Sequence, residues 1–426
     1  MTIPLHLAEF AGVFRVVLEV CIAAIVYTYV GYPALLLLVG SLRRHRNPDP
    51  GYCPSMSLLI AAYNEEKNIG AKIEQTLALN YPAHKLEVIV LSDCSTDGTD
   101  EIVRSFQDRR VRLLRMNRRR GKTHAQNEGV KIARGEIIVF SDATTIYHPQ
   151  ALRYLAGNYR DQRVGAVTGR NHYYDPHDNS PTGLGSTTFW SYENTIKGMQ
   201  SRIHSLSGCV GCIYSVRKSL YTRLRDDVIS DLVQPLWVIQ QGYRVVFESR
   251  AWAYEETTTS TAQEFSMRIR VVTRGMRGLL SVPELLKPWK YGWISFQLFS
   301  HKIMRWMVPL FLIGALVSCP LAGGATWLQP MLALQLAFYL AALISIVLPV
   351  HRLYKPLGIP LYFCTLNAAA FISFVELLRG HKYVIWETVR QEPERVPAVG
   401  GALRTGTYAE SVDFATQSIF ESSSVN

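Results

Sequence analysis

Three apolar runs of this chain end abruptly on polar residues, and this pattern constrains the fold more than any other feature. Residues 86–93 read LEVIVLSD and residues 135–142 read GEIIVFSD, so both runs end on Ser-Asp. A third run, over residues 56–62, ends on Tyr-Asn-Glu-Glu. Segments of helical length lie between the runs, and this alternation predicts βαβ units with a parallel sheet. Because such sheets bind ligands beyond the carboxyl ends of their strands, we expect a functional site at this edge.

Long apolar stretches indicate a membrane protein. They cover residues 13–40, 306–324, 331–350 and 357–378, and each is near the ~20 residues that a bilayer crossing needs. Arg-Arg-His-Arg at 43–46 follows the first stretch, which we interpret as a retained anchor. The positive-inside rule then predicts a cytoplasmic globular region and location in the cytoplasmic (inner) membrane as a multi-pass protein. A net charge of +11 suits contact with anionic lipids. No groove of interleaved aromatic residues indicates a nucleic-acid partner.

These patterns predict an order of domains. We expect an N-terminal transmembrane anchor over 1–46, a globular domain over 54–280, interfacial helices over 281–304, a C-terminal transmembrane region over 305–390 and a disordered tail over 391–426. Four crossings would leave the C-terminus outside, whereas the basic residues after 378 favour the inside. The stretch 357–378 contains Pro360 and Asn367 and is therefore the candidate for a re-entrant or interfacial segment. The number of crossings stays open.

Seven short motifs occur in order along the chain. They are AAYNE at 61–65, LSDCSTDGT at 91–99, GKTHAQN at 121–127, FSDAT at 140–144, GAVTG at 165–169, SDLVQP at 230–235 and RIRVVTRG at 268–275. With these motifs the chain resembles membrane-embedded family 2 glycosyltransferases, among them bacterial synthases of exopolysaccharide, poly-N-acetylglucosamine and hyaluronan. The resemblance implies an α/β GT-A domain with a Rossmann-like mixed sheet, together with transmembrane and interfacial α-helices.

The resemblance also implies a set of donor-binding residues. For the nucleotide-sugar donor these are Ala62, Tyr63, Glu65, Asp93, Lys122, Asp142, Arg270 and Arg274. The carboxylates of Glu65 and Asp93 can accept hydrogen bonds from a uracil N–H or from ribose hydroxyls. Capping of the following helices is the structural alternative for both residues.

A metal ion and a base are implied as well. Asp142 corresponds to the first acid of the family's metal motif, so Mg²⁺ or Mn²⁺ is expected there. The motif reads Asp-Ala-Thr, and Thr144 is therefore only a weak ligand. Asp231 corresponds to the base that removes the proton from the acceptor hydroxyl in an inverting displacement. Gly208 and Gly211 belong to a loop expected beneath the acceptor, where glycine permits close approach of the backbone.

Two departures from the family pattern bear on the product. Ser230 stands where relatives carry a second acid, and Val271-Val-Thr-Arg274-Gly275 replaces the Gln-x-x-Arg-Trp of processive relatives. We assign Arg274 and then Arg270 to the donor diphosphate, and we expect Arg277 to face the membrane.

The function expected from these features is that of an inverting, metal-dependent glycosyltransferase. It would move a sugar from a nucleotide-diphospho-sugar, UDP-linked by preference, to a growing glycan or a lipid-linked acceptor in exopolysaccharide biosynthesis. One alternative is a nonprocessive transferase that adds a single sugar to a polyprenyl-linked acceptor. Another is a catalytically idle nucleotide-binding subunit of a polysaccharide export complex. Expected partners are the donor, the acceptor, membrane lipids and subunits of such a complex.

Overall fold

The structure is a computed structural model that describes residues 5–43, 48–49, 51–174, 183–256, 261–323, 326–348, 356 and 358–385. All of them belong to a compact unit over Met1–Val389, and a second unit comprises Arg390–Asn426. The predicted disordered tail lies outside the described residues.

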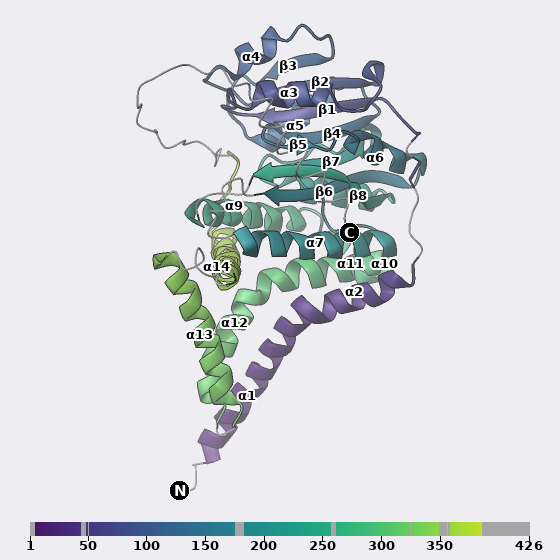
Figure 1. Ribbon diagram of the computed structural model, residues 1–426. Coiled ribbons are helices and arrows are strands. Elements are labelled where there is room, and N and C mark those ends of the chain that lie inside the picture. The colour runs from purple at the N-terminus through teal and green to yellow at the C-terminus, as the bar shows by residue number, and fades with distance from the viewer. Residues whose placement is uncertain are drawn as a thin grey trace, which may run out of the picture. The chain divides into compact units, whose positions relative to one another are not determined.

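An eight-stranded mixed sheet forms the centre of the globular region (Figure 1). Its strands lie in the order β3-β2-β1-β4-β7-β6-β8-β5. Their bounds are β1 Met56–Ala62, β2 Leu86–Ser92, β3 Val111–Arg115, β4 Ile137–Asp142, β5 Ile146–Tyr147, β6 Val164–Tyr174, β7 Ile213–Arg217 and β8 Arg244–Glu256. The first four strands of this order are parallel, and β7 runs antiparallel to both β4 and β6.

The predicted edge of polar strand ends is confirmed. The central strand β1 pairs with β2 on one side and β4 on the other, so that Ala62 lies opposite Ser92 and Ala61 lies opposite Asp142. Every residue of β1 is buried. This burial follows from the helices on both faces of a parallel sheet, and it explains the continuous apolar runs in the sequence.

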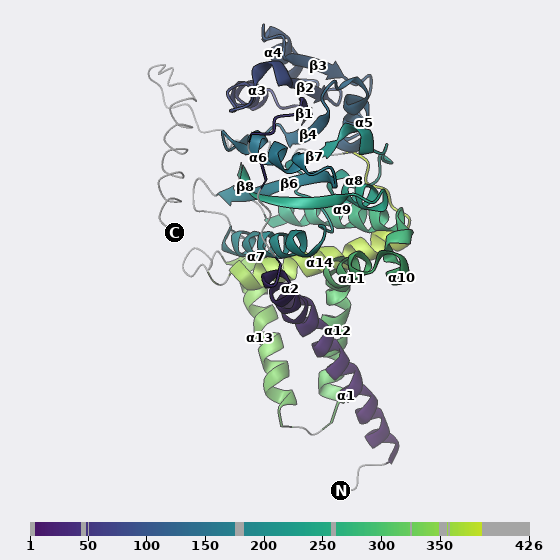
Figure 2. The same cartoon turned by 90° about the vertical axis from the view of Figure 1, so that its right-hand side faces the viewer.

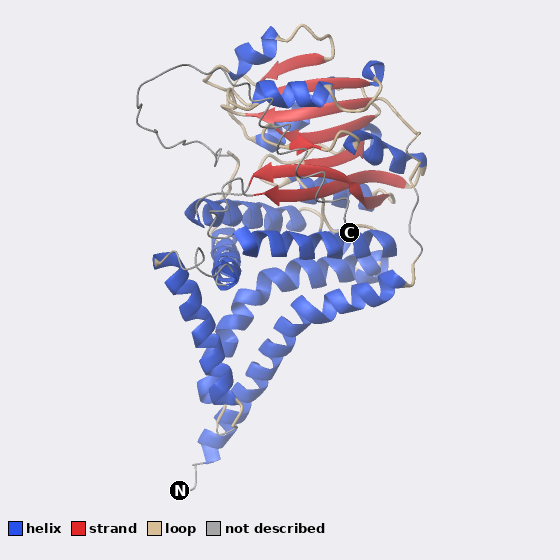
Figure 3. Cartoon of the chain, viewed as in Figure 1, coloured by secondary structure: helices blue, strands red, loops and turns tan. Residues whose placement is uncertain are grey.

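Helices cover both faces of the sheet (Figure 3). The core on one face joins β1 to α3 and α6, whereas the other face packs against α5 and α8. The helices of the globular region are α3 Ile69–Leu77, η2 Ala83–Lys85, α4 Thr99–Ser105, α5 Lys122–Ile132, α6 Ala151–Gly157, η3 Asn158–Arg160, α7 Gly183–Ile203, η4 Lys218–Leu220, α8 Ser230–Gln240 and α9 Thr261–Leu280. Asn64 has φ 53° and lies in the turn between β1 and α3.

The remaining helices are long and apolar or connect such helices. Their bounds are α1 Leu5–Val26, η1 Tyr27–Gly31, α2 Tyr32–Ser41, η5 Pro283–Leu286, α10 Pro288–Tyr291, α11 Trp293–Gln297, η6 Leu298–Ile303, α12 Met304–Leu321, α13 Leu328–Val347 and α14 Gly358–Leu378. Within the described residues, four helical segments are long and apolar enough to cross a membrane, namely Phe10–Ser41, Trp293–Leu321, Leu328–Val347 and Gly358–Leu378. The second begins at Trp293 and so includes residues that we expected to lie in the interface.

Helix α14 differs from the other apolar helices in its placement. Figure 2 shows it lying across the underside of α7 and α9, whereas α12 and α13 run away from the sheet. Ser373 Oγ donates a hydrogen bond to the carbonyl of Ile269 on α9, at 3.0 Å. This arrangement favours our expectation that the segment lies in the interface, which would leave three crossings and a cytoplasmic C-terminus.

The chain that follows α14 returns to the globular region. The carbonyl oxygen of Val384 lies 2.1 Å from the point that a Cβ of Gly121 would occupy. Gly121 has φ +87° and immediately precedes α5. Only glycine fits here, because both the backbone conformation and the approaching carbonyl exclude a side chain.

Candidate active site

Two of the predicted donor-binding residues meet at the polar edge of the sheet. Lys122, the first residue of α5, forms an ion pair with the carboxylate of Asp142 at the end of β4. Burial alone would lower the pKa of Lys122, but the neighbouring Asp142 carboxylate holds that pKa above its ordinary value. A lysine and a carboxylate are therefore fixed side by side where β4 ends.

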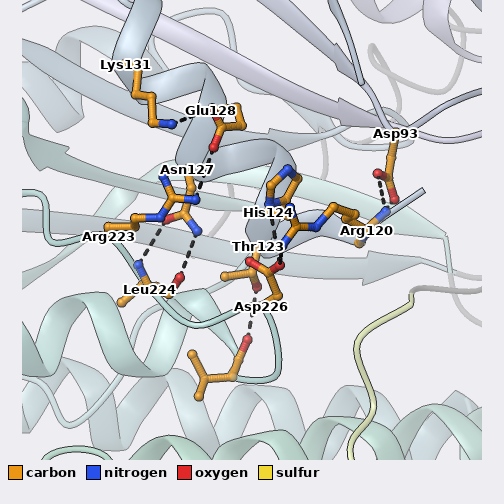
Figure 4. Close-up of polar contacts among 12 residues, drawn as sticks. Asp93, Arg120, Thr123, His124, Asn127, Glu128, Lys131, Arg223, Leu224 and Asp226 are labelled. Carbon is orange, nitrogen blue, oxygen red and sulfur yellow. Dashed lines mark hydrogen bonds and ion pairs between the residues drawn. The ribbon is translucent and has the colours of Figure 1, made fainter. Parts of the chain in front are cut away.

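Asp93 follows β2 and is bound within the protein. One of its carboxylate oxygens accepts a hydrogen bond from the backbone N–H of Arg120, at 2.8 Å, and the other accepts one from Gly121, at 2.7 Å. The side chain is 2% exposed. Figure 4 shows the contact of Asp93 with Arg120. Asp93 thus holds the loop that precedes Lys122, a role that the sequence did not reveal. Its binding to a nucleoside stays a prediction.

The polar residues after β1 are also engaged. Glu65 is buried, and its Oε2 accepts a hydrogen bond from Asn68 Nδ2 at 2.8 Å. The guanidinium of Arg119 lies 3.6 Å from the ring centroid of Tyr63, close enough for a cation–π contact. Ala62 is fully buried at the end of β1. The structure therefore gathers Ala62, Tyr63 and Glu65 beside the other strand ends, with Arg119 over the Tyr63 ring.

A loop over residues 221–228 leads from η4 into α8 and contacts α5. Asn127 on α5 donates to the Leu224 carbonyl at 2.8 Å and accepts from the Leu224 N–H at 3.0 Å. Arg120 Nη2 donates to Asp226 at 2.7 Å (Figure 4). These hydrogen bonds hold the loop against α5. They therefore fix the start of α8, at Ser230, relative to Lys122 at the start of α5.

Asp231 is the second residue of α8, and it does not cap that helix. The N-cap residue is Ile229, and no side-chain cap hydrogen bond is present. Asp231 Oδ1 is buried and has no hydrogen-bond partner in the described part of the chain. Burial raises the pKa of the carboxyl group, while the ammonium groups of Lys122 and Lys302 act to lower it. A half-buried carboxylate with an unused oxygen is suited to accept a proton.

The loop with Gly208 and Gly211 lies against this carboxylate. A Cβ on Gly211 would stand 2.7 Å from Asp231 Oδ2, and one on Gly208 would stand 3.3 Å from Leu232 Cδ1. The backbone N–H of Cys209 donates to the Asp231 carbonyl at 2.8 Å. The loop therefore leaves the Asp231 carboxylate room that a side chain at Gly211 would remove.

Arg274 reaches the same region from α9. Its Nη2 donates to Thr123 Oγ1 at 2.8 Å and to the carbonyl of Val228 at 2.5 Å. Burial lowers the pKa of Arg274 to about 10, and the nearby Arg270 guanidinium acts in the same direction. These bonds hold Arg274 against Thr123, the residue that follows Lys122 in the sequence. Arg270, on the same helix, is half-buried. The assignment of both to the diphosphate stays a prediction.

Our expectation for Arg277 was wrong. Its Nε donates to the carbonyl of His381 at 2.9 Å, and its Nη1 lies 3.7 Å from Asp227. The side chain therefore binds the chain that returns after α14 and does not face lipid. Sequence spacing placed Arg277 on the correct helix, but it could not show which segment covers that face.

Comparison with known proteins identifies the region that contains the strand ends. Residues 57–225 match the profile of the family described as Glycosyl transferase family 2. The chain carries a family 2 glycosyltransferase domain. The match includes Asp93, Lys122 and Asp142 and ends before Asp231.

Relatives of this glycosyltransferase domain occur in staphylococci. The chain is 28% identical over 235 residues to a poly-beta-1,6-N-acetyl-D-glucosamine synthase of Staphylococcus aureus strain COL, and 28% identical over 238 residues to one of Staphylococcus epidermidis. Each alignment covers 53% of this chain and 55% of the relative. The chain thus spans about half the length of the curated relatives it matches.

A solved structure shares the fold of the glycosyltransferase domain and its helices. The mannosyltransferase PcManGT from Pyrobaculum calidifontis, solved in complex with GDP-mannose and Mn²⁺, superposes with a TM-score of 0.66. The two chains are 23% identical, and the match covers 85% of this chain and 99% of the other. This likeness confirms the predicted GT-A fold.

The glycosyltransferase domain offers few ligands for a metal ion. Among the described residues, no group of three or more His, Cys, Asp or Glu side chains could hold one. At the polar edge of the sheet, a metal ion could contact the carboxylate of Asp142, which pairs with Lys122, and the hydroxyl of Thr144. These residues fit an ion that takes its other ligands from a bound diphosphate and from water, as hard divalent cations do.

Sequence reasoning missed a group of charged residues on the other side of Asp231. Glu193 and Lys197 lie on α7, and His301, Lys302 and Arg305 lie at η6 and the start of α12. All five line one cavity together with Asp231. The residues on α7 are about a hundred positions away in sequence from those on η6 and α12, and no sequence motif includes both groups. The charges of Lys302 and Arg305, placed within an otherwise apolar stretch, were the available signal.

Proposed function

We propose that the protein is an inverting glycosyltransferase of the cytoplasmic membrane, with its GT-A domain in the cytoplasm. The donor would be a nucleotide-diphospho-sugar, UDP-linked by preference, and the acceptor a growing glycan or a lipid-linked sugar in exopolysaccharide biosynthesis. The observation that carries this proposal is the unused Oδ1 of Asp231, a half-buried carboxylate beside the Lys122–Asp142 edge.

The reaction needs a proton acceptor and a stabilised leaving group. Asp231 would take the proton of the acceptor hydroxyl while its oxygen attacks C1 of the donor sugar from the face opposite the diphosphate. Lys122 and Arg274 would offset the charge of the departing nucleoside diphosphate. A divalent ion at Asp142, when bound, would supply further charge to the diphosphate.

Membrane attachment supports the proposed setting. The described chain holds four helical segments that are apolar enough to span a bilayer, and the Asp231 cavity is lined by residues of three of them. The staphylococcal relatives are named as synthases of a polysaccharide. Both observations favour an acceptor that is used at the membrane surface.

A panel of radiolabelled nucleotide sugars tests this function. Full-length protein in detergent, supplied with Mn²⁺ and a membrane lipid extract as the acceptor source, should consume one donor and transfer its sugar. Anomeric analysis of the product should show inversion. If no donor in the panel were hydrolysed or transferred, the alternative of a catalytically idle nucleotide-binding subunit would take its place.

Gly211→Ala tests the space around the base. The added methyl group would approach Asp231 Oδ2 to 2.7 Å unless the carboxylate moved. Because displacement of a catalytic group by about 1 Å can cost a hundredfold in rate, we expect kcat to fall roughly tenfold to a hundredfold, with donor affinity unchanged. Gly198→Ala is the matched control, since the nearest atom to its Cβ is 4.0 Å away. Equal kcat values for the two variants would contradict the role of Gly211.

A further inference from the structure

A cavity of about 500 Å³ lies between the glycosyltransferase domain and the apolar helices. Residues of the loop at Gly208–Cys209 and of the start of α8 line it on the side of the domain, and residues of η1, α7, α9, η6, α12 and α14 form the remaining walls. Much of the wall is aromatic, namely Phe189, Trp190, Tyr192, Trp306, Tyr362 and Phe363. The cavity therefore joins the proposed base to segments that we place in or at the membrane.

Two of the cations in this cavity are neutralised by carboxylates. Arg305 forms an ion pair with Glu193, whose carboxylate also lies 3.3 Å from His301 Nε2. Arg268 Nε lies 2.7 Å from the carboxylate of Glu264. Burial would raise the pKa of Glu193, but the adjacent Arg305 and His301 hold it well below its ordinary value, so the residue is ionised. These pairs leave no net charge.

Two lysines in the same cavity have no such partner. In the part of the chain that the structure describes, neither Lys197 nor Lys302 has a hydrogen bond or an ion pair within 4 Å. Lys197 is 5% exposed and lies 5.1 Å from the ring centroid of Trp190. Lys302 Nζ is 3.7 Å from the point that a Cβ of Gly208 would occupy. Burial lowers the pKa of Lys197, which reflects the cost of holding this ammonium away from water.

Among the described residues that line this cavity, the carboxylates are Glu193, which pairs with Arg305, and Asp231, so one carboxylate without an arginine partner remains for the two ammonium groups. Two cations and one carboxylate leave an excess positive charge in a partly open space with an aromatic lining. Buried charges are retained in proteins when a partner or a ligand pairs with them. A neutral glycan would supply hydroxyl groups but no such charge, whereas a phosphate group would supply both acceptor oxygens and negative charge.

We propose that this cavity binds the acceptor as a lipid-linked phosphate ester, with the phosphate on Lys197 and Lys302 and the apolar chain along the aromatic wall. The lipid would leave the cavity between Tyr29, Phe363 and Leu366, which lie on η1 and α14. This inference rests on the proposed function and specifies its acceptor.

The placement suits the transfer step. The acceptor hydroxyl would lie at Asp231, and the donor would lie on the Lys122 side of the same residue. The acceptor oxygen forms a bond to C1 of the donor sugar as the bond from C1 to the phosphate oxygen breaks. The hydroxyl proton passes to Asp231, and the nucleoside diphosphate leaves. The phosphate of the acceptor is not consumed and holds the acceptor during the step.

Equilibrium binding of radiolabelled undecaprenyl phosphate tests the inference without any donor. The full chain in detergent should bind this lipid, and neutral undecaprenol and inorganic phosphate should compete poorly. Because a charge-assisted hydrogen bond is lost at each site, the Lys197→Met/Lys302→Met variant should bind at least roughly tenfold more weakly. Lys290→Met is the control, since Lys290 lies on α10 outside the cavity and pairs with Glu284.

Three results would overturn the inference. They are equal affinity of the double variant and the wild type, equally tight binding of undecaprenol, and displacement of the lipid by inorganic phosphate at equal concentration. The comparison of the two lipids on the wild type decides the matter even if the double variant does not fold. Because no donor is used, lipid binding and sugar transfer are tested separately. Lipid binding in this assay without transfer in the donor panel would refute the proposed function and leave the lipid-phosphate site standing, whereas transfer without lipid binding would refute the site alone.

Discussion

Replacement of Asp231 by asparagine should abolish most sugar transfer and leave donor binding intact. Asparagine has nearly the same shape but cannot take the proton of the acceptor hydroxyl. General base catalysis contributes roughly a hundredfold to ten-thousandfold, and we expect kcat to fall by that factor. The donor Kd should change little, because the carboxylate faces the acceptor cavity. Transfer of labelled sugar and titration with unlabelled donor measure the two quantities separately.

The pH profile gives a second test of Asp231. A base must be ionised to act, so kcat should rise as pH increases through the pKa of this carboxyl. Burial raises that pKa above the ordinary value of an aspartate, which moves the acid limb of the profile upward in pH. The residual activity of Asp231→Asn should lack this limb. Asp108→Asn serves as the control, because Asp108 pairs with Arg110 in a loop before β3. Full activity of Asp231→Asn would exclude Asp231 as the base.

Replacement of Asp142 by asparagine should mainly weaken binding of the donor with its metal. Asp142 is the carboxylate that the donor edge offers to a divalent ion, and it also pairs with Lys122. Loss of a charged interaction of this kind costs roughly tenfold to a hundredfold in affinity. We expect the donor Kd in Mn²⁺ to rise by that factor. In the presence of EDTA, the wild type and the variant should bind the donor with similar low affinity.

Glu136→Gln provides a matched control for the Asp142 variant. Glu136 lies just before β4, at the opposite end of the strand, and forms an ion pair with Arg217. Its loss removes one carboxylate from the same strand without touching the donor edge. An Asp142→Asn protein that kept the donor affinity and the Mn²⁺ dependence of the wild type would contradict the metal assignment.

The sequence predicted the donor edge well because local patterns specify it. The runs that end on Asp93 and Asp142 are buried parallel strands, and burial on both faces is what makes such strands uniformly apolar. Parallel pairing then brings their ends to one edge without any knowledge of long-range contacts.

The acceptor cavity could not be predicted in this way. Lys197 and Lys302 meet only because α7 packs against the segment that leads into α12, and this contact leaves no periodic pattern in the sequence. The sequence also did not predict that the Asp93 carboxylate accepts hydrogen bonds from the backbone N–H groups of Arg120 and Gly121. An aspartate that follows a strand has the same sequence pattern whether its carboxylate binds a ligand or a loop. Long-range packing decided both cases.

The return of the chain from α14 to Gly121 limits how far the donor edge can be from the lipid surface. Val384 follows the end of α14 at Leu378 by only six residues, which span at most about 20 Å. With α14 in the interface, the anionic donor must enter within roughly two or three Debye lengths of an anionic leaflet. The surface potential is largely screened at the far end of this range and depletes an anionic donor only within about one Debye length, ~8–10 Å. The net charge of +11 would thus act on the rate of donor capture as well as on membrane attachment.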